Sequence, residues 1–413
     1  MTDSAPPGAG RLPRPFHLLW TATAVSNIGD GLRLTALPLL ATSITTDPRA
    51  IAGVAIAERV PWLVFILPGG AWADRFDRRA LRMRLDTARA LVMAGLLVAI
   101  SFDRVTLAAI YAVAALLASA EAVVDSSSMA IVPSTVHERD LERAGSRLSS
   151  TELVTNGLIG PPLGGLLFGA AVIAPFAVDA ASFAAAAIIM SLLPGRFRPD
   201  TNPSEQQASM RHQIAEGFRW FWSRRALRNL ALISTALGFS GFVGGSVFVL
   251  FATQTLGLSS VGYGLLIVPS AFGGVAGSIL APKLTALPLP LVLAASTVIS
   301  GAATWTMSAS STPALVAMLT ALSTAAVIVW NILTVALRQR IIPDHLLGRV
   351  GASSRFLVYS GMPFGALTGG ILADSFGIRT ALAINGIGLV AIGVLVPHLL
   401  RGIQPSSPSN TPA

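Results

Sequence analysis

The sequence of 413 residues contains no cysteine, and only 12% of its residues are charged. The missing cysteine excludes disulfide bonds, thiolate metal sites and cysteine nucleophiles. The five histidines are scattered, and the chain has neither a His-Glu-x-x-His motif nor a Walker loop, so we expect no metal, no cofactor and no enzymatic activity. A soluble chain of this size would carry about twice this share of charge to cover its surface. The low charge therefore argues against a soluble protein.

Apolar residues make up 53% of the chain, and the mean hydropathy is +0.68. A membrane-spanning helix needs roughly 20 mostly apolar residues. By this criterion we predict an all-α membrane protein of about twelve transmembrane helices. The predicted spans are 16–43, 50–73, 85–102, 106–133, 148–171, 174–194, 227–253, 260–283, 289–308, 313–338, 352–373 and 378–400.

Arginine is concentrated in every second break between these spans. The second break alone holds Arg75, Arg78, Arg79, Arg82 and Arg84, whereas the odd-numbered breaks hold only Arg49, Arg104 and Arg379. The positive-inside rule then places both termini in the cytoplasm. The basic residues form no contiguous face, so the net charge of +9 does not indicate a nucleic-acid partner. All the basic residues but Lys283 are arginine, which suggests a bacterial genome of high GC content. We therefore expect a protein of the bacterial inner (plasma) membrane.

The two halves of the chain repeat. Three glycines of the fifth span recur in the eleventh at a constant offset: Gly160, Gly164 and Gly165 match Gly365, Gly369 and Gly370. This pattern predicts two parallel six-helix repeats. We expect a cytoplasmic tail at 1–15, a first bundle at 16–194, a cytoplasmic linker at 195–226, a second bundle at 227–400 and a disordered cytoplasmic tail at 401–413. In and beyond the linker, Met210–Asn229 has an apolar face typical of an amphipathic helix on the inner leaflet.

The second break contains a recognisable loop motif. It reads Gly70-Ala71-Trp72-Ala73-Asp74-Arg75-Phe76-Asp77-Arg78-Arg79. This resembles the major facilitator loop between helices 2 and 3, Gly-x-Leu-Ala-Asp-Arg-x-Gly-Arg-Arg, with Trp72 in place of Leu and Asp77 in place of the second Gly. The resemblance implies a cytoplasmic gate motif formed by Gly70, Asp74, Arg75, Arg78 and Arg79. It also implies that Asp74 lies against the N-terminus of helix 11, near Val350–Ser353, where an anion is stabilised.

Further motifs resemble one branch of that superfamily. The run Gly160-Pro161-Pro162-Leu163-Gly164-Gly165 is similar to the helix-5 motif of proton-coupled antiporters, although Asn156 stands where a further Gly is expected. Together with Ser26–Asp30, Leu256–Gly264 and Pro343–Val350, these motifs resemble the drug-exporter branch with macrolide efflux and enterobactin-exporter-like proteins. The resemblance extends from the first span to the last.

Ionisable residues inside a bilayer are costly and therefore indicate function. Asp30 lies in the first span three residues before Arg33, a spacing that allows either a fixed ion pair or a pair opened by a proton. Glu58 is followed directly by Arg59, which favours a structural pairing. Asp86 and Arg89, close to the cytoplasmic end of the third span, favour a network of gate ion pairs.

Glu121 and Asp125 lie four residues apart in the fourth span and share one helical face. Two carboxylates this close in a medium of low dielectric should not both be ionised, so one of them is expected to hold a proton. The alternative is that an arginine from a neighbouring helix neutralises them. Glu121, Asp125 and Asp30 are therefore the proton-coupling candidates.

An apolar substrate cavity is a weaker hypothesis. Phe239, Phe242, Phe248 and Phe251 in the seventh span, with Trp330, Asn331 and Tyr359, are candidates for its lining, and packing or lipid contact is the alternative for each.

We therefore expect a secondary active transporter that exports amphipathic or lipophilic small molecules by proton antiport with alternating access. Its partners would be a small-molecule substrate, protons and membrane lipid, and it would function as a monomer. The alternatives are an exporter of one endogenous product, such as a siderophore, and a non-transporting membrane sensor on the same fold. A sensor would be expected to lose the motif around Asp74, which is kept here.

Overall fold

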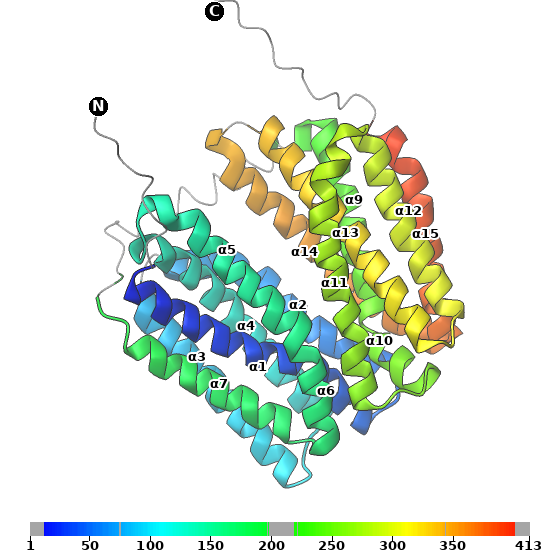
Figure 1. Ribbon diagram of the computed structural model, residues 1–413. Helices are drawn as coiled ribbons and strands as arrows, with labels where there is room; N and C mark the ends of the chain where they lie inside the picture. The colour runs from blue at the N-terminus through cyan, green and yellow to red at the C-terminus, as the bar shows by residue number, and fades with distance from the viewer. Residues whose placement is uncertain are drawn as a thin grey trace, which may run out of the picture. The chain divides into compact units, whose positions relative to one another are not determined.

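The computed structural model describes residues 12–73, 76–195, 197, 219–220, 222–342 and 344–400, and these residues form helices joined by short turns (Figure 1). No strand occurs within these ranges. A helix stands at each of the twelve predicted spans. The hydrogen bonds within a helix pair its backbone N–H and C=O groups with one another. A bilayer requires this pairing, because its interior contains no water to bind these groups.

Contacts divide the chain into two compact units. Unit 1 comprises Met1–Thr46, Ala57–Gln206 and Gly257–Val268, and unit 2 comprises Asp47–Ile56, Gln207–Leu256 and Pro269–Ala413. Two helices, α2 (Pro48–Ala73) and α11 (Ser260–Lys283), therefore contribute residues to both units. The predicted domain boundaries at 194–195 and 226–227 stay a prediction.

Unit 1 is built on α1, which packs against the helices that follow it. Its helices are α1 (Arg14–Ile44), α3 (Arg78–Ser101), α4 (Leu107–Ile131), α5 (Leu141–Glu152), the π-helix Leu153–Ile159, α6 (Gly160–Ala170) and α7 (Ala174–Ser191). The π-turn directly precedes Pro161 and Pro162, whose missing N–H groups interrupt the regular hydrogen-bond ladder. An apolar core that includes Phe16, Leu19 and Met190 holds one end of this bundle together.

Unit 2 has a core formed by five helices, α11 among them, around the buried ring of Trp330. Its helices are α9 (Arg225–Gly245), the short α10 (Phe248–Leu250), the π-helix Phe251–Thr255, α12 (Leu289–Ala309), α13 (Pro313–Ile341), α14 (Asp344–Phe376) and α15 (Ile378–Leu399). Half of the predicted amphipathic helix at Met210–Asn229, residues 210–218 and 221, lies outside the described residues, as do both predicted tails apart from 12–15.

Nine helical stretches in the described ranges are long and apolar enough, by length and composition, to cross a membrane. The helices α1, α2 and α3 are not in that count. For α1 and α3 the reason is visible, because both carry charges: Asp30 and Arg33 in α1, and Arg82, Asp86 and Arg89 in α3. All five of these side chains are buried within unit 1 rather than exposed.

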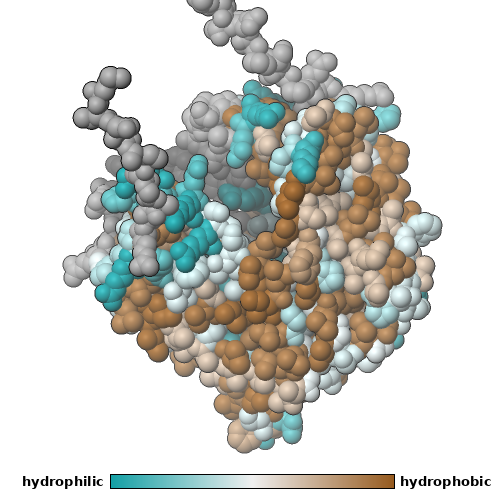
Figure 2. All heavy atoms as spheres, viewed as in Figure 1, coloured by the Kyte–Doolittle hydropathy of each residue, from teal (hydrophilic) through white to brown (hydrophobic). Residues whose placement is uncertain are grey.

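The outer faces of the helices are strongly apolar. Figure 2 shows hydrophobic side chains covering most of the visible surface over α11, α12 and α13. Large apolar residues are exposed there, including Phe272 at 63%, Trp305 at 54% and Met318 at 68%. Exposed apolar area on this scale is not tolerated in water and is what contact with lipid requires.

Candidate functional site

The main charged cluster lies inside unit 1 and is centred on Arg33. Its guanidinium group touches four carboxylates: Asp30 Oδ1 at 2.9 Å, Glu121 Oε2 at 3.2 Å, Glu58 Oε1 at 3.6 Å and Asp179 Oδ2 at 3.8 Å. These residues come from α1, α2, α4 and α7. The side chain of Arg33 is only 4% exposed, so its charge is neutralised by these carboxylates and not by bulk water.

Arg89 extends the cluster toward α3. Its Nη2 lies 2.6 Å from Asp30 Oδ1, and its Nη1 lies 3.6 Å from Asp86 Oδ1. The Arg82 Nε atom lies 3.5 Å from the other oxygen of Asp86. The same oxygen of Asp30 therefore receives hydrogen bonds from two arginines, Arg33 and Arg89. Asp30 connects the two parts of the network.

Close helix packing brings these groups together. A Cβ atom on Gly29 would lie 2.2 Å from both Asp179 Oδ1 and Ser182 Oγ, so only glycine allows α7 to approach α1 this closely. Arg89 also stacks on the ring of Phe183 in α7, with its Cζ 3.8 Å from the centroid. The cluster thus depends on small residues in α1 as much as on its charges.

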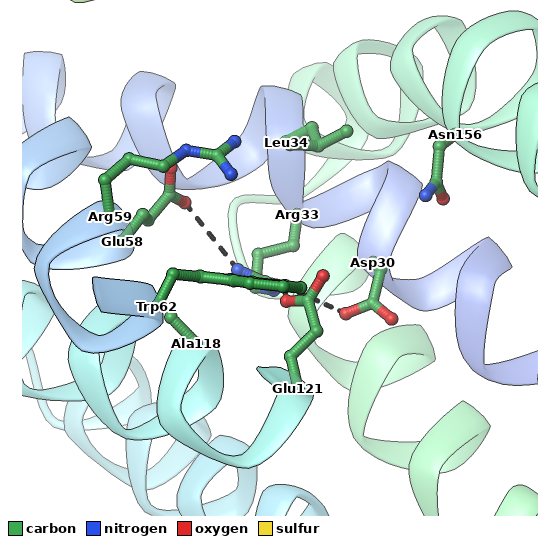
Figure 3. A pocket seen from close by; sticks show the side chains of 9 residues that line it. All are labelled: Asp30, Arg33, Leu34, Glu58, Arg59, Trp62, Ala118, Glu121 and Asn156. Carbon is green, nitrogen blue, oxygen red and sulfur yellow. Dashed lines mark hydrogen bonds and ion pairs between the residues drawn. The ribbon is translucent and has the colours of Figure 1, made fainter. Parts of the chain in front are cut away.

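A cavity of about 50 Å³ opens beside Arg33. Figure 3 shows the Arg33 guanidinium at its centre, with Glu58 on one side and Asp30 and Glu121 on the other. The remaining lining residues are Leu34, Arg59, Trp62, Ala118 and Asn156. This volume admits about one or two water molecules, which suits a proton or a small ion better than an organic substrate.

The structure separates the two carboxylates that share a face of α4. Glu121 turns toward Arg33 and lines the cavity, whereas Asp125 is exposed and has no ion pair among the described residues. The predicted i,i+3 pair of Asp30 and Arg33 is present. Glu58 pairs with Arg33 of α1, so the structural pairing that the sequence favoured is present.

Asp179 is the residue that the sequence analysis missed as a candidate. Its side chain is fully buried, and neither of its carboxylate oxygens accepts a hydrogen bond from a described residue. Its position in the sequence could have indicated a functional residue, because Asp179 is the lone acidic residue of the otherwise apolar helix Ala174–Ser191. A charged side chain in such a helix costs free energy in a membrane. Nothing in the sequence pairs it with Arg33, which lies far away along the chain.

The predicted gate motif is described only in part. Asp74 and Arg75 lie outside the described residues, and Gly70 is placed only as part of the helical backbone of α2. The Arg78 Nη1 atom donates to Ala130 O at 3.0 Å, and Arg79 Nε donates to Met190 O at 3.1 Å. Both arginines thus bind the carbonyl ends of neighbouring helices, where cations are favoured. Asp77 caps α3, accepting a hydrogen bond from Ala80 N at 2.9 Å.

The predicted helix-5 motif forms a close contact with α1. A Cβ on Gly160 would lie 2.5 Å from Gly31 Cα, and one on Gly164 would lie 2.5 Å from Leu32 O. Gly165 approaches Ser260 O of α11 equally closely, and Pro161 packs against Gly264. The motif therefore holds the π-turn and α6 against the α1 segment that carries the charges.

A second cavity, of about 200 Å³, lies inside unit 2, and we call it the unit 2 pocket. It is lined by Leu237, Ser240, Gly241, Gly244, Gly245, Phe248, Ser300, Thr304, Met307, Thr320, Ser323, Thr324, Val327, Leu382, Asn385 and Leu389. Of the predicted cavity residues, Phe248 lines it, whereas Phe239, Phe242, Trp330, Asn331 and Tyr359 do not. Trp330 is only 2% exposed and packs in the core.

Within the described ranges, no group of three or more His, Asp or Glu side chains is arranged to hold a metal ion. The carboxylates around Arg33 are already engaged by guanidinium groups.

Known sequences that resemble this chain match it over nearly its whole length. The profile of the family described as "Transmembrane secretion effector" matches residues 12–407. The multidrug efflux pump Tap of Mycobacterium tuberculosis is 26% identical over 403 residues, covering 92% of this chain and 93% of the pump. The Tap pump of Mycolicibacterium fortuitum is also 26% identical, over 415 residues, covering 94% and 96%.

Solved structures show the same fold at low sequence identity. A bacterial homologue of the human lysosomal transporter Spinster superimposes with a TM-score of 0.75 at 15% identity, covering 95% of this chain and 98% of that one. A bacterial homologue of the iron transporter ferroportin gives a TM-score of 0.72 at 16% identity, covering 94% and 99%.

Proposed function

Because the chain belongs to the transmembrane secretion effector family, a drug-exporter branch of the major facilitator superfamily, we propose that it exports amphipathic or lipophilic small molecules by proton antiport. The family and the structural relatives are transporters, which fits the absence of catalytic motifs from the sequence. Alternating access between two bundles is the mechanism that such a fold serves.

The observation that carries the proton-coupling proposal is an imbalance of buried charge. The carboxylates of Asp30, Glu58, Asp86, Glu121 and Asp179 share Arg33, Arg82 and Arg89, and Arg59 lines the same cavity. Five acids therefore face four arginines. An unpaired ionised carboxylate in a dry interior is costly, and binding a proton removes this cost.

Asp30 is suited to act as the switch in this network. While ionised, it holds Arg33 and Arg89 together through one oxygen. A proton on Asp30 would release both arginines, and Arg33 would then bind more tightly to Glu121, Glu58 or Asp179. Such a change biases a two-state element by altering local charge. The helix-5 motif, packed on Gly31 and Leu32, would transmit a movement of α1 to α6.

The remaining sequence hypotheses belong to the same proposal. Asp74, with Arg75, Arg78 and Arg79, would close the cytoplasmic side through an anion at a helix N-terminus. The protein would lie in a bacterial plasma membrane with both termini in the cytoplasm and would function as a monomer.

The test uses two carboxylates one turn apart on α4. In proteoliposomes with an imposed pH gradient, Glu121→Gln should still bind substrate but lose transport against the substrate gradient. Asp125→Asn is the matched control and should transport like the wild type, since Asp125 is exposed and lies outside the network. Equal loss in both variants, or normal coupling in both Glu121→Gln and Asp30→Asn, contradicts the assignment to this cluster.

The wild-type protein decides between the broader alternatives. Transport of several unrelated lipophilic compounds supports a multidrug exporter, and transport of one compound supports an exporter of a single endogenous product. No transport with or without the gradient would favour a sensor and end the transport proposal.

A further inference from the structure

The unit 2 pocket differs in chemistry from the cavity beside Arg33. Not one of its lining residues is charged, whereas Asp30, Arg33, Glu58, Arg59 and Glu121 line the other cavity. Its volume of about 200 Å³ is four times that of the charged cavity, at about 50 Å³. The two cavities therefore suit different ligands, one a proton or water and the other an uncharged organic group.

The pocket is formed by five helices of unit 2, namely α9, α10, α12, α13 and α15. The Ser240 Oγ donates to Asn385 Oδ1 at 2.6 Å, and Asn385 Nδ2 donates to Ser240 O at 3.0 Å. This reciprocal pair fixes α9 against α15. Ser300 and Ser323 join α12 to α13 through a hydroxyl–hydroxyl hydrogen bond of 2.8 Å. The walls are thus held by hydrogen bonds, and the pocket does not need a ligand to form.

The polar atoms of the pocket are mainly acceptors. The hydroxyls of Thr304, Thr320 and Thr324 each donate to a backbone carbonyl four residues earlier, at 2.8–2.9 Å. Their protons are therefore used, while the oxygen lone pairs stay available. Between these oxygens lie apolar side chains, among them Leu237, Phe248 and Met307. A ligand that matches this surface is apolar, uncharged and carries N–H or O–H donors.

The pocket is open along α9. Gly241 and Gly245 are both exposed, and a Cβ atom added at either position would meet no atom of the chain within 4 Å. Glycine is therefore not required at these positions by helix packing, in contrast to Gly365 or Gly386, where a Cβ would lie within 2.5 Å of backbone atoms. The missing side chains leave space that the ligand can use.

We propose that the unit 2 pocket binds the uncharged, lipophilic part of the transported molecule and selects substrates that carry hydrogen-bond donors. The physiological role of this pocket rests on the proposed export function. Binding of a ligand to the pocket can nevertheless be measured without transport. A permanently charged group gains nothing here, because no side chain in the pocket can pair with it.

The first experiment fills the pocket. Radiolabelled chloramphenicol, a neutral lipophilic compound with one amide and two hydroxyl donors, serves as the probe for equilibrium binding to detergent-solubilised protein. Gly241→Leu should weaken binding by about tenfold or more, because the side chain occupies the ligand space. Gly388→Leu on α15 is the matched control: its Cβ also meets nothing within 4 Å, but Gly388 does not line the pocket. It should bind chloramphenicol like the wild type.

The second experiment keeps the shape of the pocket and removes acceptors. The double variant Thr320→Val/Thr324→Val should weaken chloramphenicol binding about threefold to tenfold. It should bind the diacetylated derivative, whose hydroxyl donors are masked, as the wild type does. Thr297→Val is the control, because Thr297 donates to a carbonyl four residues earlier in the same way but lies outside the pocket.

The outcomes separate this proposal from the export function. Wild-type binding in both pocket variants, or no chloramphenicol binding by the wild type, overturns the pocket assignment even if proton-driven export is observed. Weaker binding in both pocket variants with unchanged controls supports the pocket even if no proton-driven export can be measured. Should Gly241→Leu fail to fold, as judged by size-exclusion chromatography, the valine variants decide.

Discussion

Four carboxylates converge on Arg33, so its removal is the sharpest test of the charged cluster. Arg33→Met keeps a long unbranched side chain but leaves Asp30, Glu58, Glu121 and Asp179 without their shared partner. Three of these contacts are within 3.6 Å, and the arginine side chain is 4% exposed, so solvent cannot replace it.

The expected loss of stability follows from burial. Removing one partner of a buried ion pair costs about 3–5 kcal/mol, because the other charge is left uncompensated. For a chain of this length we expect the thermal midpoint to fall by about 5 °C. Adding Asp179→Asn to Arg33→Met removes a stranded charge that has no other ion pair among the described residues, and should recover about 0.5–3 kcal/mol of that loss.

Acidity should also restore the variant. In the folded variant, the stranded carboxylates become neutral by binding protons. The same carboxylates in the unfolded chain are surrounded by water and bind fewer protons. Stability of Arg33→Met should therefore rise between about pH 8 and about pH 6, by more than that of the wild type. The sign follows because the folded state binds the extra proton and is favoured where protons are abundant.

Thermal unfolding of purified protein in detergent, followed by fluorescence-detected size-exclusion chromatography, measures these shifts. Arg139→Met is the control, because Arg139 is 77% exposed and pairs with Asp140 only at 3.8 Å, so its loss should change stability by at most about 0.5 kcal/mol. Wild-type stability of Arg33→Met at both pH values, or no recovery on adding Asp179→Asn, would refute the view that Arg33 neutralises this cluster.

Three further experiments test other parts of the molecule. Gly31→Ala should lower stability by about 1–3 kcal/mol, because its Cβ would lie 2.6 Å from Thr155 O, whereas Gly95→Ala in open space should be neutral or slightly stabilising by thermal unfolding. Asp74→Asn should abolish most transport in vesicles at normal expression, since the proposed gate contact of Asp74 would form in one conformation only. A reporter after Ala413 should be cytoplasmic, and one near Asp47 should be external.

Each of these has a clear contrary result. Equal melting of Gly31→Ala and the wild type would mean that the α1 contact with Thr155 relaxes easily. Normal efflux by Asp74→Asn would remove the gating role. An external reporter after Ala413 would overturn the predicted orientation.

The positions of the helices were predictable from hydropathy, while several of their ends were not. The third span was placed at 85–102, but α3 begins at Arg78, because Asp77 caps it and Arg82 and Arg89 are buried inside the unit. Likewise α14 begins at Asp344 and not at 352. A hydropathy criterion ends a span where charges begin, but a helix continues when its charges find buried partners.

The charged site was predictable only where its partners are local. The spacing of Asp30 and Arg33 predicts their ion pair, and the structure contains it. Arg33 also contacts Glu58, Glu121 and Asp179, which lie on three other helices. The spacing of residues within one helix does not predict contacts between helices. The candidate cavity aromatics were likewise chosen by residue type, because the sequence does not show which helices surround them. Residue type alone could not distinguish a cavity-lining position from a core position, and Trp330 is a core residue.

The two proposed sites lie in different units, and this has a consequence for coupling that can be measured. If a substrate competed directly with protons for the carboxylates around Arg33, its affinity would change by about tenfold per pH unit over a wide range. A neutral ligand in the unit 2 pocket, which lacks charged residues, is linked to the proton only through a conformational equilibrium. Such coupling is limited to about 1–3 kcal/mol, so the affinity for chloramphenicol should change by at most about 150-fold and then level off. Equilibrium binding across the pH range distinguishes the two cases: a plateau at both ends supports separate sites, whereas a slope of about tenfold per pH unit without a plateau means that proton and substrate share one site.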